Sequence, residues 1–263
     1  MAAAKDRECE MWGSAPWERV APTMGAIHDR LTAVLGPCPG ERWLDVGTGT
    51  GAIAVRAARA GAQVTGLDLA PPLIETARRL AAEEGLAISF DVGDAEALPY
   101  GDASFDVVSS AHGVVFAPDH AAAARELARV CRPRGRLGMT AWRTGEAGDG
   151  FDELITRFAP PRPAGSRPRS WGEDTHAREL LGNAFDLEFI RDVWIQAGES
   201  GEAIWQLLTT ASPPFKALAE ELDPPRRDVL HAAWVEFYER HRTADGIRVP
   251  HGYVVIIGRR QVG

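Results

Sequence analysis

The chain has 263 residues, of which 45% are hydrophobic and 25% are charged, and it carries a formal net charge of −8 at pH 7. These values are typical of a globular protein that can bury one α/β core with an appended cap, and no segment approaches the roughly 20 apolar residues of a membrane-spanning helix. The acidic balance argues against nucleic acid as a ligand, because a protein that tracks phosphates needs a basic stripe. The densest basic stretch, residues 162–169, holds only three arginines.

The first residues and the cysteines bear on the cellular compartment. The N-terminal sequence MAAAKDRECE is polar and charged, unlike a secretory signal. The three cysteines, Cys9, Cys38 and Cys131, are odd in number and show no CxxC pairing. This usage argues against a disulfide framework or a zinc site, so we expect a cytoplasmic protein without a bound metal and without a membrane or nucleic-acid partner.

The first two regions of the chain differ in their regularity. Residues 1–40 are irregular to helical, with a helix-like run at residues 22–35. Residues 41–142 alternate strand signals with helix signals. The strands are expected in ERWLDVG, AQVTGLDL, AISFDVGD, SFDVVSS and RLGMTAW, and the helices at residues 52–60, 71–84 and 120–131. This alternation predicts βαβ units with right-handed crossovers and a mostly parallel sheet.

The third region, residues 143–263, is less regular. It begins with a Gly-, Pro- and Arg-rich stretch that contains one helical turn at residues 151–158, and a strand is expected at residues 185–197. Three helical segments follow near residues 202–211, 214–222 and 225–241, and HGYVVIIGRR forms a last strand. We therefore expect an N-terminal lid (1–40), a Rossmann-like core (41–142), and cap helices with the final sheet strands (143–263).

A glycine-rich turn is the most informative stretch. Residues 45–51 read DVGTGTG, directly between a predicted strand and a predicted helix. Glycine lets the backbone approach a ligand closely, and the helix N-terminus that follows offers free N–H groups. The pattern by itself is ambiguous, because GTGAIA at residues 49–54 also satisfies the dinucleotide fingerprint GxGxxG/A, with Asp68 near the distance expected for a ribose contact.

Three acidic residues distinguish a methyl donor from a dinucleotide. Asp45 precedes the first glycine, where a carboxylate can orient the ammonium group of a methionine but offers nothing to a pyrophosphate. Asp68 ends the second strand and can accept both ribose hydroxyls. Asp94 follows the third strand, where with Ala95 it can hold an adenine edge. A nicotinamide enzyme also needs a second nucleotide half, which the irregular C-terminal region does not supply.

These motifs resemble those of the class I S-adenosylmethionine-dependent methyltransferases, and especially the small-molecule branch related to ubiquinone and menaquinone biosynthesis. The resemblance covers residues 41–142 through ERWLDVGTGTGA, VTGLDLAPPLIETAR, GDAEALPYGDASFDVV and ELARVCRPRGRLGMTAW, and continues more weakly to YVVIIGRR. It implies a Rossmann-like α/β fold with a seven-stranded, mostly parallel sheet whose last strand is antiparallel. It also implies S-adenosyl-L-methionine as the cofactor and a small-molecule acceptor.

The resemblance assigns the parts of the cofactor to residues of this chain. The glycine loop and Asp45 would surround the methionine moiety, Asp68 and Leu69 the ribose and adenine edge, and Asp94 and Ala95 the adenine. The full expected set is Asp45, Gly47, Thr48, Gly49, Gly51, Asp68, Leu69, Asp94, Ala95 and Ala111.

One departure from the family pattern suggests a catalytic residue. After SFDVVSS, relatives of this branch usually carry Ser-Phe-Gly, whereas this chain has Ala111, His112 and Gly113. The end of the fourth strand lies beside the transferable methyl group in such folds, so His112 is the first candidate for a general base. The alternative is a histidine packed where phenylalanine would otherwise sit. His28, on the N-terminal helix, is the second candidate, and His251, at the start of the last strand, is the third. The remaining histidines, His120, His176, His231 and His241, are interpreted as solvated helix residues.

Aromatic residues suggest the acceptor pocket. Aromatic side chains at lids and strand ends commonly line pockets for flat apolar ligands. The candidates for acceptor binding are Trp12, Trp17, Phe116, Trp142 and Trp171. The expected function is therefore methyl transfer from S-adenosylmethionine to oxygen, carbon or nitrogen of a small aromatic or apolar molecule. Two alternatives stay open: a cofactor-binding protein that transfers no methyl group, and an NAD-dependent oxidoreductase.

Overall fold

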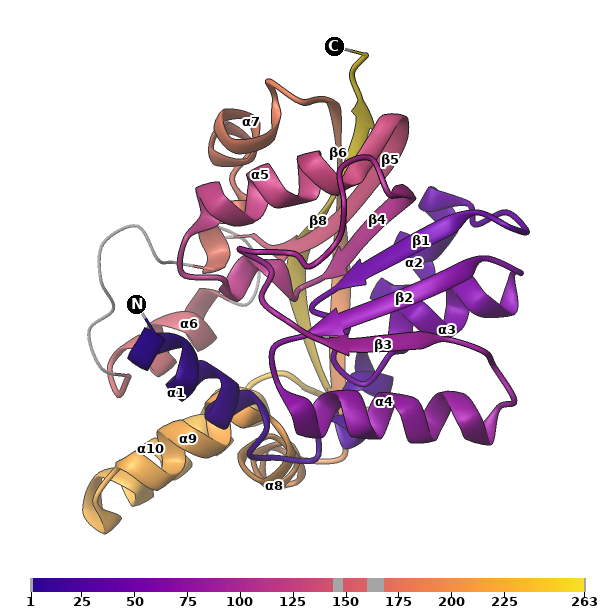
Figure 1. Cartoon of the computed structure of the whole chain (residues 1–263). Helices are drawn as coiled ribbons and strands as arrows, with labels where there is room; N and C mark the ends of the chain where they lie inside the picture. The colour runs from indigo at the N-terminus through magenta and orange to yellow at the C-terminus, as the bar shows by residue number, and fades with distance from the viewer. Residues whose placement is uncertain (1, 144–148, 160–167, 263) are drawn as a thin grey trace.

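A computed structural model describes residues 2–143, 149–159 and 168–262 (Figure 1). The strands are β1 (Arg42–Val46), β2 (Gln63–Asp68), β3 (Ser89–Val92), β4 (Phe105–Ala111), β5 (Cys131–Trp142), β6 (Phe185–Gly198), β7 (Arg242–Thr243) and β8 (Gly246–Arg260). The α-helices are α1 (Ala2–Trp12), α2 (Gly25–Leu35), α3 (Ala52–Arg59), α4 (Pro71–Glu83), α5 (His120–Val130), α6 (Asp149–Thr156), α7 (Asp174–Leu181), α8 (Gly201–Ala211), α9 (Pro213–Glu221) and α10 (Pro224–Glu239). Short 3₁₀ turns are η1 (Trp17–Arg19), η2 (Ala21–Met24), η3 (Val114–Phe116) and η4 (Pro168–Gly172).

The strands form one twisted sheet in the order β3-β2-β1-β4-β5-β8-β6. The pairs from β3 to β5 are parallel, and β8 runs antiparallel to both β5 and β6. The prediction of a mostly parallel Rossmann-like sheet with an antiparallel last strand is confirmed. The structure adds β7, which has two residues and pairs with the start of β8.

The last strand is longer than its sequence suggested. It was expected from His251, but β8 begins at Gly246 and passes through Pro250. Proline cannot donate a hydrogen bond to a sheet, so it is tolerated only where a strand has a free side. The β5–β8 pairing ends at Tyr253, and Pro250 is paired only with Ile195 of β6. The first part of β8, before Tyr253, is therefore paired with β6 and, at its first two residues, with β7, but not with β5.

Helices cover both faces of the sheet. The helices α2, α3 and α4 lie on one face, and α5 and α7 lie on the other (Figure 1). Each face has its own buried core, built around Trp43 and Ile27 on the first side and around Leu127 and Trp171 on the second. A third core, with Trp234 at its centre, joins the helices α8, α9 and α10 to α6. These C-terminal helices lie next to α1, close to the ends of the central strands (Figure 1).

Candidate functional site

The glycine turn lies at the carboxyl end of β1, against the turn that follows β4. Gly47, Gly49 and Gly51 have φ angles of 65°, 55° and 87°, in the left-handed region that favours glycine. A Cβ added at Gly47 would lie 2.7 Å from Gly113 Cα, and one added at Gly113 would lie 2.6 Å from the Gly47 carbonyl oxygen. The two turns are therefore in direct backbone contact, and no pattern in the sequence singled out Gly113 as part of the site.

Asp45 is a buried carboxylate held by two hydroxyl groups. It is paired with Ser109 in the parallel register of β1 and β4, so their side chains lie next to each other. The hydroxyls of Ser109 and Thr48 donate to its two oxygens at 2.8 Å and 2.6 Å. Ser109 in turn accepts from the indole N–H of Trp43 at 2.8 Å. Burial raises the pKa of Asp45 to about 6, and no described basic side chain forms an ion pair with it.

Asp68 ties the end of β2 to the glycine turn. Its two oxygens accept hydrogen bonds from the backbone N–H groups of Gly49, at 2.8 Å, and Ala70, at 3.0 Å. The side chain is almost completely buried, and this burial raises its pKa. Leu69, which follows it, is half-buried. Asp68 therefore lies beside the glycine turn.

The N-terminal helix reaches the end of β3. The ammonium group of Lys5, on α1, forms ion pairs with both Asp94 and Glu96. On the same helix, the thiol of Cys9 donates to the carbonyl oxygen of Leu69 at 3.3 Å. Asp94 also accepts from the backbone N–H of Glu96 at 2.9 Å. Thus α1 lies across the residues expected to hold ribose and adenine.

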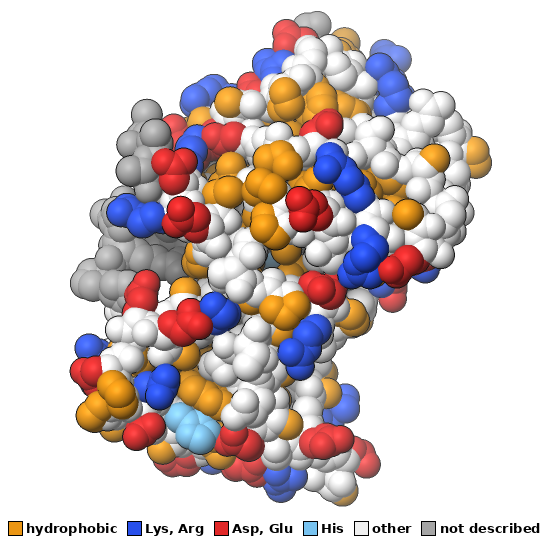
Figure 2. All heavy atoms as spheres, turned by 60° about the horizontal axis from the view of Figure 1, so that its bottom comes forward, with side chains coloured by type: hydrophobic (Ala, Val, Ile, Leu, Met, Phe, Trp, Pro, Cys, Tyr) orange, Lys and Arg blue, Asp and Glu red, His pale blue; other side chains and the backbone are white. Residues whose placement is uncertain are grey.

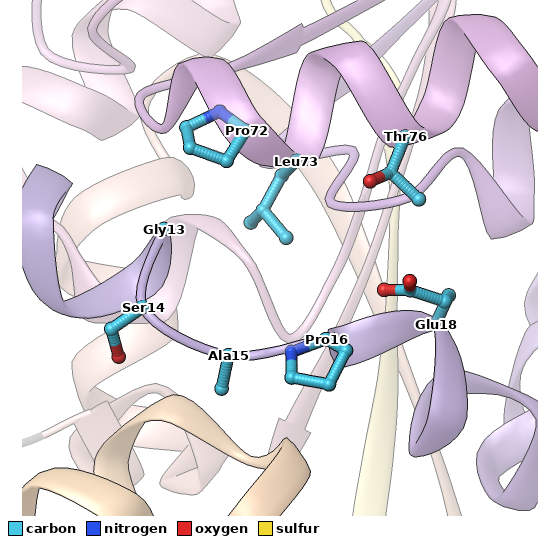
Figure 3. Close-up of a pocket in the computed structure, with 8 residues that line it drawn as sticks. All are labelled: Gly13, Ser14, Ala15, Pro16, Glu18, Pro72, Leu73 and Thr76. Carbon is cyan, nitrogen blue, oxygen red and sulfur yellow. The ribbon is translucent and has the colours of Figure 1, made fainter.

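The segment after α1 continues along α4. Residues 13–16 and Glu18 face Pro72, Leu73 and Thr76 of α4 across a pocket of about 260 Å³ (Figure 3). A Cβ added at Gly13 would lie 3.0 Å from the ring of Pro72, so the segment packs closely on the start of the helix.

Three of the five candidate aromatic residues lie together near the glycine turn. The rings of Trp12 and Phe116 are 4.9 Å apart, and those of Trp12 and Trp17 are 6.1 Å apart. A Cβ at Gly49 would lie 3.6 Å from the indole of Trp17. All three aromatic residues are half-buried. The structure therefore brings Trp12, Trp17 and Phe116 together over one end of the turn.

A second aromatic group begins at His112. This residue is buried, has a φ of 54°, and follows the half-buried Ala111 at the end of β4. Its ring lies against Trp142 of β5, with centroids 4.3 Å apart, and its Nδ1 is 2.8 Å from the hydroxyl of Thr140. Trp142 also contacts Trp194 and His251, at 5.6 Å and 6.0 Å between centroids. Trp142 thus lies next to His112 because β5 is the neighbour of β4 in the sheet.

Two of the residues predicted to belong to the site, His28 and Trp171, do not join either aromatic group. His28 is buried on α2, where burial first, and the charge of Arg56 second, lower its pKa to about 4. No hydrogen bond or ring contact between described residues links His28 to the strand ends. Trp171 is fully buried and packs on His120 and His176, at 5.3 Å and 6.0 Å between centroids.

One interpretation of the histidines is wrong. His120, expected to be solvated, is buried, and its Nδ1 lies 3.0 Å from Nε2 of His176. The reason is tertiary: α7 packs on α5 and covers the start of that helix. The basic stretch at residues 162–169 lies largely outside the described residues. Ala95 packs at the edge of the second core.

On the face in Figure 2, acidic and basic side chains are interspersed, without an extended basic patch. No three His, Cys, Asp or Glu side chains among the described residues gather as metal ligands. Within that part of the chain, no helix has the length and apolarity to cross a bilayer.

Comparison with known proteins gives a consistent picture. Residues 44–139 match the family model described as a methyltransferase domain. An uncharacterized protein of Mycobacterium tuberculosis, Rv1405c, is 40% identical over 179 residues, which are 66% of this chain and 64% of that protein. The match thus spans less than two thirds of this relative. Nocamycin O-methyltransferase of Saccharothrix syringae is 29% identical over 259 residues, 89% of this chain and 90% of that protein.

Solved structures share the fold. A putative methyltransferase from Bacillus halodurans superposes with a TM-score of 0.64 at 19% identity, covering 90% of this chain and all of that one, 100%. At this identity the likeness concerns the fold alone. The matching domain model covers β1 to β5, the strands whose ends carry the glycine turn and the buried carboxylates. The domain match and the shared fold agree that residues 44–139 form a methyltransferase domain, and the relative named nocamycin O-methyltransferase is similar to this chain over a wider range.

Proposed function

We propose that this protein binds S-adenosylmethionine at the ends of β1, β2 and β3 and catalyses methyl transfer to an oxygen of a small, apolar or aromatic acceptor. The observation that carries the proposal is Asp45. A buried carboxylate without a basic partner among the described residues is costly, and an ammonium group from a ligand would relieve that cost. The methionine moiety of the cofactor carries such a group.

The other cofactor contacts follow from the same end of the sheet. In open α/β sheets, ligands bind at the carboxyl ends of the strands. Asp68 keeps further lone pairs for ribose hydroxyls after accepting two backbone N–H groups, and Gly47 and Gly49 keep side chains away from the ligand. Asp94, with Ala95, would bind the adenine edge. S-adenosylmethionine, when bound, supplies the methyl group, and the protein holds the two reactants in line and excludes water.

The acceptor side is supported by the aromatic residues and by one relative. Trp12, Trp17 and Phe116 cover the glycine turn, and Trp142 covers one face of His112. Half-buried aromatic rings at strand ends favour a flat apolar ligand. The relative named nocamycin O-methyltransferase, aligned over 89% of this chain, favours oxygen as the methylated atom. We place α1 and residues 13–24 as the lid of this site and α8 to α10 as its cap.

Binding and transfer are tested separately. Calorimetry with S-adenosylhomocysteine is expected to show saturable binding, and Asp45→Asn with Asp68→Asn should lose it. A thermal-shift comparison with NADH is expected to show stabilisation by S-adenosylhomocysteine only, and stabilisation by NADH alone would overturn the proposal. Incubation with labelled S-adenosylmethionine and a small-metabolite extract, followed by product mass, should give a singly methylated product. Binding without any product would favour the alternative of a protein that holds the cofactor without transferring a methyl group.

A further inference from the structure

One hydroxyl on the neighbouring strand holds His112 at two points. Ala111, the last residue of β4, pairs with Thr140 of β5, and His112 follows in a left-handed turn with a φ of 54°. In this turn the backbone N–H of His112 donates to Thr140 Oγ1 at 3.1 Å, and its Nδ1 lies 2.8 Å from the same oxygen. The imidazole orientation is therefore set by Thr140, while Trp142 covers one face of the ring.

The hydrogens around Thr140 Oγ1 determine which ring nitrogen carries the proton. The backbone N–H of His112 can only donate, so it occupies one lone pair of the hydroxyl oxygen. Thr140 is fully buried, and among the described residues its only contact that can accept the hydroxyl hydrogen is Nδ1 of His112. A proton on Nδ1 would leave that buried hydrogen without an acceptor, a cost that corresponds to a preference of roughly tenfold or more against this tautomer. Neutral His112 then carries its proton on Nε2.

We propose that Thr140 fixes His112 as the Nε2–H tautomer, so that the ring donates a hydrogen bond to the acceptor oxygen instead of removing a proton from it. The inference rests on the methyl transfer proposed above and deepens it. To act as a general base, Nε2 would need a free lone pair, and the Nε2–H tautomer has none there. His112 is then a positioning donor, and Thr140 acts through it.

A donor at this place selects the chemical class of the acceptor. An oxygen that is already anionic when it binds accepts the hydrogen bond from Nε2–H and keeps a lone pair for the methyl group. It loses no proton on methylation: the C–O bond forms, the C–S bond breaks, and the electron pair of that bond stays on sulfur. A phenol or an alcohol would instead need a base for its proton. Carboxylates and acidic enols on an apolar framework are therefore the acceptor class of this site.

The tautomer can be measured without knowing the acceptor. Long-range proton–nitrogen NMR correlation spectra of the full chain, labelled with nitrogen-15 in its histidines, distinguish a protonated Nδ1 from a protonated Nε2. The signal of His112 is identified as the one that is lost in His112→Gln. At neutral pH the wild type should show Nε2–H for His112. Thr140→Val, which removes only the hydroxyl, should raise the Nδ1–H form, and Thr140→Ser should keep the wild-type pattern. A proton on Nδ1 in the wild type, or no change in Thr140→Val, would overturn the inference.

Turnover provides a second readout. Glutamine can donate from a position close to Nε2 but cannot act as a base, so His112→Gln should keep activity within about tenfold of wild type, whereas loss of a general base costs about 10²–10⁴-fold. His112→Ala is the matched control, since both variants share the left-handed backbone. The probes are benzoate and naphthoate against phenol and naphthol, and preference for the phenols would contradict the proposed class. Absence of turnover with every probe would count against methyl transfer itself, and the spectra would still decide the tautomer.

Discussion

The buried carboxylate of Asp45 makes cofactor binding sensitive to pH. Burial raises its pKa to about 6 in the ligand-free protein, while Thr48 and Ser109 donate to both of its oxygens. If this carboxylate binds the ammonium group of the ligand, only the ionised form binds well, and protonation competes with the ligand. The dissociation constant for S-adenosylhomocysteine should therefore rise as the pH falls through this pKa. With a pKa of about 6, the expected change between about pH 7 and about pH 5 is roughly tenfold.

Calorimetry across this pH range measures the effect, and one ligand supplies the control. Methylthioadenosine shares the adenosine part but lacks the amino acid part, so its affinity reports on Asp68, whose pKa is also raised, and not on Asp45. The difference between the two ligands isolates the ammonium contact. Asp45→Asn should remove that difference and weaken S-adenosylhomocysteine at neutral pH by about tenfold or more. The reasoning is refuted if S-adenosylhomocysteine binds equally well at both pH values, or tighter at the lower one.

Three further predictions concern the turn, the N-terminal helix and a buried histidine. Gly47→Ala, at a φ of 65° and with its Cβ 2.7 Å from Gly113 Cα, should lower the free energy of unfolding by about 3 kcal/mol in denaturant titrations. Gly40→Ala, at a φ of 80° in open space, is its control and should cost only about 1 kcal/mol. Lys5→Ala removes the cation that is paired with Asp94, so this variant should bind S-adenosylhomocysteine about threefold more tightly than the wild type. Weaker binding of the ligand would show instead that Lys5 holds the closed lid. In the folded protein the pKa of His28 is about 4, below its ordinary value of 6.5. As the pH falls, the unfolded chain therefore takes up a proton at this residue before the folded protein does, and the free energy of unfolding decreases between pH 6.5 and pH 4. Between about pH 7 and about pH 5, the free energy of unfolding should fall by about 2 kcal/mol less in His28→Leu than in the wild type. If the free energies of unfolding of the two proteins change in parallel with pH, this assignment is contradicted.

The cofactor end of the protein could be predicted because its features are local in the sequence. The turn at Gly47 to Gly51 lies between a short apolar strand and a helix, and the parallel sheet brings the ends of β1 and β2 together without further information. Asp68 consequently lies where the pattern expected it, with Gly49 bonded to its carboxylate. The alternation of strands with helices likewise predicted the mostly parallel sheet, because such alternation admits few arrangements, whereas the antiparallel last strand was implied by the family resemblance.

The acceptor end depends on contacts between distant parts of the chain, which no local pattern encodes. The inferred role of His112 as a donor rests on a hydroxyl on Thr140, 28 positions away, and the pattern of β5 shows that residue only as part of a buried strand. Lys5 reaches Asp94 across 89 positions, and His120 is covered by Trp171 of η4 and by His176 of α7. The sequence thus determined the sheet and the glycine turn, whose geometry follows from backbone and periodicity. Packing decided which buried polar groups meet, because each hydrogen bond there depends on where a separate element comes to lie.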